Sequence, residues 1–282
     1  SELTEFIKDR QTKVNFLLGS NLTNEDYVSF REFSKTISQS ESSFYLNDDL
    51  LYKGFFGDNI ELAKIDDLNS SDAIVVWAED LKEKLPVLYL RIRQAVKNGV
   101  KLVVFGHTNE TLSDIADVFY GKDMVSENFE ILKDLSKMKE INNLVVGKNI
   151  TAILGKSTPY QADESITKLF EFLNSNANSK VLNAYSKGNT YGAFQTLENL
   201  KGLNDFVNDI SKDNTDLLFI VGADPIGRSV YSNQIKSIIK SIDTVVTLDN
   251  FNHETSELSD YVVPISSTSV SYTHLRAHET SA

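Results

Sequence analysis

The stretch TDLLFIVGADPIGRSVYSNQIKSIIKSIDTVVTLDNFNHETSELSDYVVPI, residues 215–265, decides the fold class of this chain. It opens with a continuous apolar run at residues 217–221, which is typical of a strand buried on both faces of a parallel sheet. The turn that follows, GADP, contains a glycine and a proline, so it ends the strand. Isoleucines at positions 235, 238, 239 and 242 have the spacing of one helix face, and a second apolar run follows at residues 244–248. Together these segments predict a βαβ unit, whose crossover is right-handed in nearly all cases.

Composition excludes several classes of function. The 282 residues carry a formal net charge of −12, whereas proteins that bind nucleic acid or anionic membranes need a basic surface. We therefore expect no nucleic-acid partner. The chain has no cysteine, which removes disulfides, thiolate catalysis and cysteine-ligated zinc or iron–sulfur clusters within it. No apolar run approaches the roughly 20 residues that a bilayer requires, so we expect no direct membrane insertion.

The rest of the chain alternates strands and helices in the same way. KVNFLLGS, residues 13–20, predicts a strand that ends in a Gly-Ser turn, and Thr23 with Asp26 predicts a near capping box before the next helix. Residues 38–69 are polar and irregular, which predicts a surface loop or small subdomain. Further strands are predicted at residues 73–77, 101–105 and 149–157, helices at residues 3–10, 25–36, 86–98 and 163–174, and a helix-rich part at residues 114–139.

The sequence also repeats itself at offsets of 136 to 144 residues. The matched positions, in order, are Gly19 and Gly155, Asp72 and Asp216, Asp80 and Asp224, Leu102 and Val245, and Asp117 and Asp260. This period is too long for a solenoid unit and predicts two related halves instead. We place the first half at residues 1–145, with the irregular insertion at 38–69, and the second at residues 146–268. The predicted fold class is α/β, with two related, doubly wound, mainly parallel sheets and helices on both faces of each.

Ligands of doubly wound folds bind beside the carboxyl ends of the strands. Those ends are expected at residues 19–21, 78–80, 106–108, 155–157, 222–225 and 249–255. Neither G-x-G-x-x-G nor G-x-x-x-x-G-K-[ST] is present, so the two best-defined phosphate motifs are missing. The GADP turn could still bind phosphate through backbone N–H groups, although ending a strand explains its glycine and proline more simply.

Two histidines lie at predicted strand ends. His107 follows the strand at residues 101–105, and His253 lies in NHETSE. Either could act as an acid or base near pH 7. The sequence names no nucleophile or carboxylate partner for them, and Glu254 alone does not make a dyad. We therefore assign neither histidine a catalytic role.

The other two histidines belong to an unusual C-terminal segment. His274 and His278 have the i, i+4 spacing of a helical zinc pair. However, VSYTHLRAHETSA, residues 270–282, resembles a translated sequencing-adaptor peptide and breaks the composition of what precedes it. We expect residues 269–282 to be a non-native tail, and we expect no metal site.

Four segments resemble the molybdopterin oxidoreductase superfamily. TNEDYVSFREFSK, residues 23–35, looks like that family's TNEE-x-Y helix. SDAIVVWAEDLKEKLPVLYLRIRQAVKNGVKLVVF, residues 71–105, resembles its succession of aspartate, strand, proline-led helix and strand. VGADP resembles its G-x-N-P turn, and TLDNFNHETSELSDYVVPI, residues 247–265, resembles its D-x-F-x-T-E-T-x-x-A-D-V-V-L-P segment. In this order the matches cover nearly everything from Val14 to Ile265.

Departures from the family pattern indicate a branch of the family. Active molybdenum enzymes place a Cys, selenocysteine, Ser or Asp ligand after the TNEE helix, whereas SQSESSFYLNDD, residues 38–49, has no recognisable ligand motif. The usual Asp-Pro-Arg after the second strand is replaced by Gly106, His107 and Thr108, and the asparagine of G-x-N-P is Asp224. With these differences, the chain resembles the degenerate, cofactor-free form of the family's domain. That form occurs in the large iron–sulfur subunit of bacterial NADH–quinone oxidoreductase (respiratory complex I).

This resemblance implies a non-catalytic scaffold fragment of an electron-transfer complex. No cofactor or metal would bind to the fragment itself, while the parent subunit would carry iron–sulfur clusters. Its partners would be other subunits of the peripheral arm. The fragment would lie in the cytoplasm and be attached to the inner membrane through the complex.

Two alternatives remain. The chain could be the nucleotide-binding middle of an active formate-dehydrogenase-like or nitrate-reductase-like enzyme that binds molybdopterin guanine dinucleotide as a bis-pterin cofactor. The contacting residues would then be Gly19, Ser20, Asn21, Gly222, Asp224, Glu254 and Thr255. The chain could instead be an unrelated doubly wound module that binds NAD, FAD or a guanine nucleotide.

Overall fold

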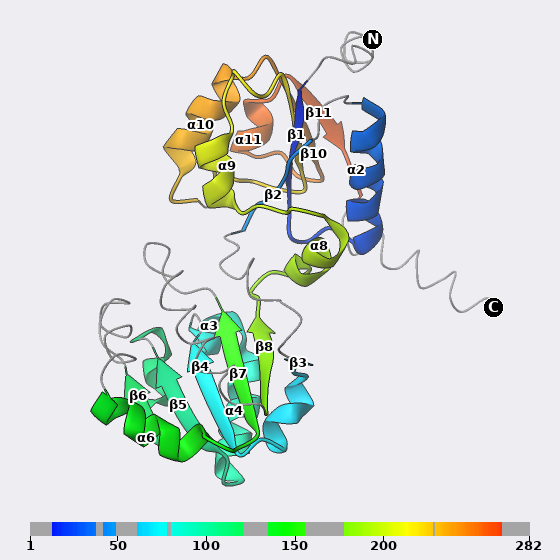
Figure 1. Ribbon diagram of the computed structural model, residues 1–282. Coiled ribbons are helices and arrows are strands. Elements are labelled where there is room, and N and C mark those ends of the chain that lie inside the picture. Colours follow the sequence, from blue (N-terminus) through cyan, green and yellow to red (C-terminus); the bar gives the residue numbers. More distant parts are fainter. Residues whose placement is uncertain are drawn as a thin grey trace, which may run out of the picture. The chain divides into compact units, whose positions relative to one another are not determined.

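The computed structural model describes residues 13–37, 42–48, 61–77, 80–105, 107–120, 135–155, 178–227 and 229–266, with the side chains of residues 107–109 and 135–138 left aside. The chain forms two compact units (Figure 1). The first comprises Ser1–Leu50 and Lys187–Ala282, and the second comprises Leu51–Ser186. Each contains an all-parallel sheet with helices, which confirms the α/β fold class predicted from the sequence.

The sheet of the first unit has five parallel strands in the order β11-β10-β9-β1-β2. The strands are β1 (Val14–Leu18), β2 (Phe44–Leu46), β9 (Leu217–Val221), β10 (Thr244–Asp249) and β11 (Tyr261–Pro264). β1 pairs with β9 along its whole length, from Val14 opposite Leu217 to Leu18 opposite Val221. Every residue of these two strands is buried, as expected for central strands covered on both faces.

Helices cover both faces of this sheet. On one face, α2 (Asn24–Ile37) and α8 (Thr190–Thr196) contribute Tyr27, Ile37 and Ala193 to a cluster with side chains of β1, β2 and β9. On the other face, α9 (Leu203–Asp209) and α10 (Ser232–Ser241) contribute Phe206, Ile235 and Ile239 to a second cluster. A short helix, α11 (Glu254–Glu257), follows β10.

The capping box predicted before α2 is confirmed. The Thr23 backbone N–H donates to Asp26 Oδ2 (2.9 Å), and the Asp26 backbone N–H donates to Thr23 Oγ1 (3.2 Å). These two bonds satisfy backbone donors that the first turn of a helix otherwise leaves free. The start of α2 is therefore set by local sequence.

The sheet of the second unit has six parallel strands in the order β3-β8-β7-β4-β5-β6. The strands are β3 (Glu61–Leu62), β4 (Ala73–Trp77), β5 (Lys101–Phe105), β6 (Val118–Tyr120), β7 (Ile150–Gly155) and β8 (Ser179–Ala184). One face is covered by η1 (Ile65–Asn69), α3 (Leu81–Lys84), α4 (Pro86–Lys97) and η2 (His107–Ile115). The opposite face is covered by α6 (Leu135–Val145), so this sheet is also flanked on both sides.

The two sheets have the same strand order once the sequence repeat is applied. Strands β1, β2, β9, β10 and β11 correspond to β7, β8, β4, β5 and β6. Replacing each strand by its counterpart converts the order of the first sheet into that of the second, with β3 added at one edge. Each sheet thus takes β-strands from both halves of the repeat. The boundary proposed from the sequence between residues 145 and 146 consequently lies inside the second unit.

The aspartates that marked the repeat make equivalent contacts in the two sheets. In each case a carboxylate before one strand accepts a hydrogen bond from a backbone N–H at the start of the neighbouring strand. The pairs are Asp216 with Lys13 (2.8 Å), Asp72 with Asn149 (2.9 Å), Asp260 with Val245 (2.8 Å) and Asp117 with Leu102 (2.9 Å). These aspartates therefore recur because they join neighbouring strands, and they do not form a ligand site.

Some segments differ from the elements predicted for them. Residues 44–46, in the part predicted to be irregular, form β2, because this short apolar run pairs with β1 and is buried. Residues 118–120, in a part predicted to be rich in helix, form β6 beside β5. The helices predicted at residues 3–10 and 163–174 and the tail at residues 269–282 lie outside the described residues.

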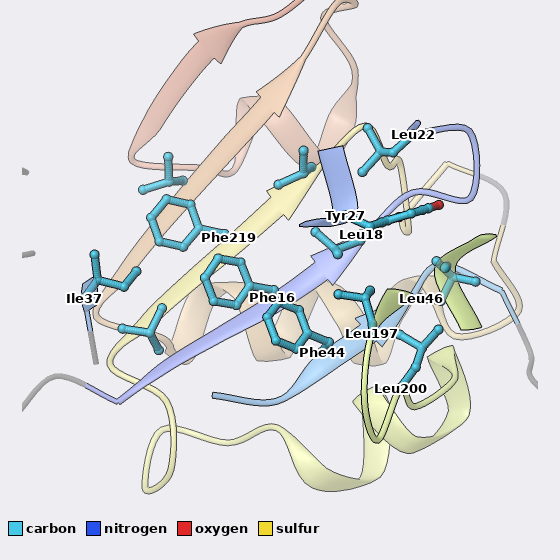
Figure 2. Packing of buried hydrophobic residues seen from close by; sticks show 14 of the residues in the cluster. Phe16, Leu18, Leu22, Tyr27, Ile37, Phe44, Leu46, Leu197, Leu200 and Phe219 are labelled. Carbon is cyan, nitrogen blue, oxygen red and sulfur yellow. The ribbon is translucent and has the colours of Figure 1, made fainter. Parts of the chain in front are cut away.

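Phe16 lies at the centre of the first unit's core (Figure 2). Its side chain is fully buried on β1, and its ring stacks between Phe44 of β2 and Phe219 of β9, with ring centroids 5.1 and 5.2 Å away. Phe30 and Phe33 of α2 contact the same ring at 6.2 and 6.5 Å. One aromatic side chain therefore joins three strands to the helix that covers them.

Replacing Phe16 with alanine should lower the free energy of unfolding of the first unit by about 4 kcal/mol, because the surrounding rings cannot close the cavity. Urea unfolding followed by circular dichroism measures this loss. Phe251→Ala is the matched control, since the Phe251 ring is 73% exposed and its removal should change stability by no more than about 0.5 kcal/mol. Equal losses in the two variants would contradict the central role of Phe16.

Candidate functional site

The carboxyl ends of β1 and β9 are the best-placed candidate site. In the sheet order, the chain continues from β1 to β2 on one side and from β9 to β10 on the other, so the connections diverge between these neighbours. Doubly wound folds bind their ligands at such a switch point. Gly19 follows β1 and Gly222 follows β9, so two of the residues predicted to bind a cofactor in the enzyme alternative lie at this point.

Gly19 and Gly222 bring the two turns into backbone contact. The Gly19 N–H donates to the Val221 carbonyl (2.7 Å), and the Gly222 N–H donates to the Leu248 carbonyl (2.8 Å). A Cβ at Gly19 would overlap the Gly222 carbonyl oxygen. Gly222 has a φ of 58°, which L side chains rarely adopt. Both glycines are thus required by the protein's own backbone, and neither leaves an open cradle for a ligand.

Ser20 and Asn21, which follow β1, are bound by the segment that precedes α8. The Asn189 N–H donates to the Ser20 carbonyl (2.6 Å), and the Gly188 N–H donates to Asn21 Oδ1 (3.3 Å). The Asn189 side-chain amide also donates to the Leu22 carbonyl (2.8 Å). Polar groups at the end of β1 are therefore engaged by the segment that precedes α8.

Tyr27 holds the turn after β1, at Gly19, from within the core of the first unit. Its hydroxyl donates to the Gly19 carbonyl (2.8 Å), and its side chain is fully buried. Burial raises the pKa of this hydroxyl far above its ordinary value, and the neighbouring Asp26 carboxylate adds to the rise. Tyr27 therefore remains a neutral hydrogen-bond donor throughout the physiological pH range.

Asp224, in the GADP turn, has its carboxylate committed to internal contacts. Its Oδ1 accepts hydrogen bonds from the Thr255 hydroxyl (2.7 Å) and the Gly227 N–H (3.1 Å). The Nδ1 atom of His253 lies 3.5 Å from the same oxygen. A Cβ at Gly227 would overlap the Asp224 carboxylate, so this glycine makes room for it. The turn is therefore closed by its own side chains.

His253 lies between two carboxylates. Its Nε2 is 3.2 Å from Asp249 Oδ2, and its Nδ1 accepts the Ser256 N–H (3.3 Å) at the start of α11. Its side chain is only 14% exposed. Asp249 precedes it by four residues, a spacing that could have suggested this pair, whereas Asp224 comes from another turn. His253 thus caps α11 through Nδ1, and a carboxylate oxygen lies within 3.5 Å of each ring nitrogen.

The two remaining residues of the predicted cofactor site, Glu254 and Thr255, have different partners. Thr255 is fully buried and bound to Asp224. Glu254 instead pairs with Lys236 Nζ on α10 (2.5 Å), so it does not join the Asp224 carboxylate. Gly19, Gly222, Asp224 and Thr255 thus gather around the ends of β1, β9 and β10.

The corresponding edge of the second unit is described only in part. Asp80, the counterpart of Asp224, caps α3 by accepting the Lys82 N–H (2.9 Å) and the Glu83 N–H (3.2 Å). Residues 78–79, 106 and 156–177 lie outside the described residues. The His107 side chain and the His274–His278 pair also lie outside them, so the acid–base and zinc hypotheses at those positions stay untested.

The described residues were compared with the requirements of a metal site and of a membrane-spanning helix. Among them, no group of three or more His, Cys, Asp or Glu side chains could hold a metal ion. Within the same ranges, no helix has the length and apolar character needed to cross a membrane.

Fold and site together define a doubly wound α/β protein whose candidate site lies at the switch point of a parallel sheet. The chain matches the family model described as molybdopterin oxidoreductase over residues 1–269. Because the match covers nearly the whole chain, the chain belongs to the molybdopterin oxidoreductase family. A comparison with curated proteins gave no match.

The described residues at the β1–β9 edge do not fit the anionic nucleotide form of a pterin cofactor. Asp224 and Asp249 place two carboxylates beside the turn, and neither pairs with a lysine or arginine among the described residues. A phosphate there would meet like charge instead of the free backbone donors that such groups require. The Gly227 N–H, a donor that the turn could offer, is already bonded to Asp224.

Gly19→Ala should lower the free energy of unfolding by about 3 kcal/mol, because the added methyl group displaces the Gly222 backbone. Thermal and urea unfolding measure the effect. Gly188→Ala is a suitable control: its added Cβ would lie 3.2 Å from the end of the flexible Asn21 side chain and 4.0 Å from the Ser20 carbonyl oxygen. That change should cost no more than about 1 kcal/mol. A Gly19→Ala variant as stable as the wild type would show that the two turns are not in close contact.

Tyr27→Phe should lower the free energy of unfolding by about 1–2 kcal/mol near neutral pH, because the Gly19 carbonyl loses its buried donor. The pH dependence has a definite sign. The raised pKa of Tyr27 means that the unfolded chain loses this proton first, from about pH 10 upward, so the wild type loses stability as pH rises.

The variant lacks this titrating hydroxyl, so its stability should fall less steeply above about pH 10. Urea unfolding of both proteins over the alkaline range provides the comparison. Parallel stability curves would contradict the raised pKa.

Proposed function

We propose that this chain is a non-catalytic scaffold region of the large iron–sulfur subunit of bacterial NADH–quinone oxidoreductase. In this proposal it supports the peripheral arm of respiratory complex I and holds no redox centre itself. Its partners are other peripheral-arm subunits. It lies on the cytoplasmic side and reaches the inner membrane only through the complex.

The closed, acidic turn at Asp224 carries this proposal. An asparagine at this position, as in the family's G-x-N-P turn, would be neutral and could donate to a ligand as well as accept. Asp224 can only accept when ionised, and its Oδ1 already accepts from Thr255 and Gly227. The second carboxylate, Asp249, adds negative charge on the other side of His253. A phosphate-bearing cofactor is disfavoured at this edge by the charge of the two carboxylates, and the Gly227 N–H is already bonded to Asp224.

The segment after α2 supports the same proposal. An active molybdenum enzyme would present a metal ligand in this part of the chain. Within it, residues 44–46 form β2, and their Phe, Tyr and Leu side chains are buried in the core of the first unit. The sequence contains no cysteine, so a Cys ligand is excluded, whereas the serines and aspartates within residues 38–41 and 49–60 lie outside the described residues.

Elemental analysis of the complete natural protein tests the proposal. We expect iron but no stoichiometric molybdenum or tungsten, and no fluorescent pterin after acid oxidation. Stoichiometric molybdenum or tungsten together with a pterin would overturn the scaffold role, because the cofactor would then be bound despite the acidic turn.

One observation favours the alternative of an active molybdopterin enzyme: Gly19, Gly222, Asp224 and Thr255 meet at the switch point where such a cofactor's nucleotide would bind. Thermal unfolding of this chain with guanosine diphosphate, NAD or FAD distinguishes the possibilities. The scaffold role predicts no rise in melting temperature, whereas specific binding to the folded state raises it with ligand concentration. Asp224→Asn, which removes the charge, is the informative comparison: a rise only in the variant would identify Asp224 as the excluding group.

A further inference from the structure

Helix α4 of the second unit has an exposed apolar face that its own core does not use. Its inner face places Leu88, Ile92 and Ala95 in the cluster beneath it, all of them buried. On its outer face, Val87 and Leu90 are 65% and 62% exposed. These two large apolar side chains lie one helical turn apart and are both turned toward solvent, so they are available to contact another molecule.

The exposed side chains of α4 form one line. Val87, Leu90, Gln94 and Lys97 follow each other at intervals of three, four and three residues, and all four are exposed. Since successive residues turn by about 100° around the axis, this spacing keeps them on one side of the helix, with Arg91 and Arg93 on either flank. We call these six residues the α4 face.

The α4 face is basic, in contrast to the rest of the chain. It carries Arg91, Arg93 and Lys97 and no acidic residue, whereas the whole chain has a net charge of −12. Arg93 rests against Tyr89, with Nη1 donating to the hydroxyl (3.2 Å) and the guanidinium 5.7 Å from the ring centre. Arg91 forms no ion pair with any carboxylate of the described residues.

We propose that the α4 face docks an acidic amphipathic helix of a partner protein. Arginine is enriched at protein–protein interfaces, and an amphipathic helix docks through its apolar stripe. A partner helix with leucines along one stripe and carboxylates beside it would match the apolar line and both arginines. The proposal adds a surface and a partner chemistry, and it does not depend on whether a pterin binds.

Charge decides against other occupants. A second copy of this chain docked through the same face would place arginines against arginines, because a twofold interface brings identical patches together. Nucleic acid and anionic membranes would meet a chain with a net charge of −12 around this one basic face. The α4 face also lacks the aromatic side chains that anchor helices at a membrane interface.

The test uses a synthetic fluorescein-labelled helical peptide with leucines at heptad positions a and d and glutamates elsewhere. Fluorescence anisotropy with the full chain should show saturable binding that weakens as salt is added. Leu90→Glu and the double variant Arg91→Glu, Arg93→Glu should each reduce affinity by about tenfold or more. Val146→Glu should leave affinity unchanged, since Val146 is equally exposed, at 63%, but lies after α6. Circular dichroism should show unchanged folding in every variant.

Several results would overturn the proposal. One is absence of peptide binding, and another is binding that Leu90→Glu does not reduce. A version of the peptide with lysines in place of glutamates that binds equally well would remove the charge argument. Sedimentation with phosphatidylserine vesicles that depends on Leu90 would assign the face to a lipid surface, and dimerisation abolished by Leu90→Glu would assign it to a second copy.

Discussion

The parallel pairing of β1 with β9 is the contact on which the first unit depends. It joins segments about 200 residues apart, and the Lys13 N–H donates to the Asp216 carboxylate across 203 positions of sequence. β7 and β4 make the equivalent pair in the second unit. The entropy cost of closing such a long connection grows only with the logarithm of its length, so extensive burial of two central strands outweighs it. Because of these two pairings, each sheet contains strands from both halves of the sequence repeat.

The same pairing determines the character of the candidate site. Because β1 and β9 are neighbours, their turns meet, and Gly19 lies too close to Gly222 for any side chain. At the switch point of this sheet, the N–H groups of Gly19, Gly222 and Gly227 and the side chains of Asn189 and Asp224 are already bonded within the protein. Doubly wound sheets bind ligands at such an edge, whereas in this chain internal contacts engage the groups just named. Family membership and cofactor binding are therefore separate questions for this chain.

Sequence reasoning identified most central strands because they are continuous apolar runs, and it identified the repeat because glycines and aspartates recur at strand ends. It missed β2, since a run as short as Phe44–Leu46 carries too little periodicity to be distinguished from a loop. It gave His253 no partner, because Asp224 lies on another turn and reaches the imidazole only through the fold. It named Gly19 and Gly222 as possible ligand contacts. Their positions in the sequence do not reveal that the two glycines contact each other in the fold.

Sequence by itself determined the α/β class, the parallel character of the sheets, the capping box at Thr23 and Asp26 and the family. These are properties of local pattern, since periodicity and turn chemistry act over a few residues. Only the tertiary structure decided which half contributes which strand, that Gly19 serves backbone packing, and that Asp224 is held by Thr255 and Gly227. A buried strand carries the same apolar pattern whichever neighbour it pairs with, so the choice of neighbour is made by the packing of the whole sheet.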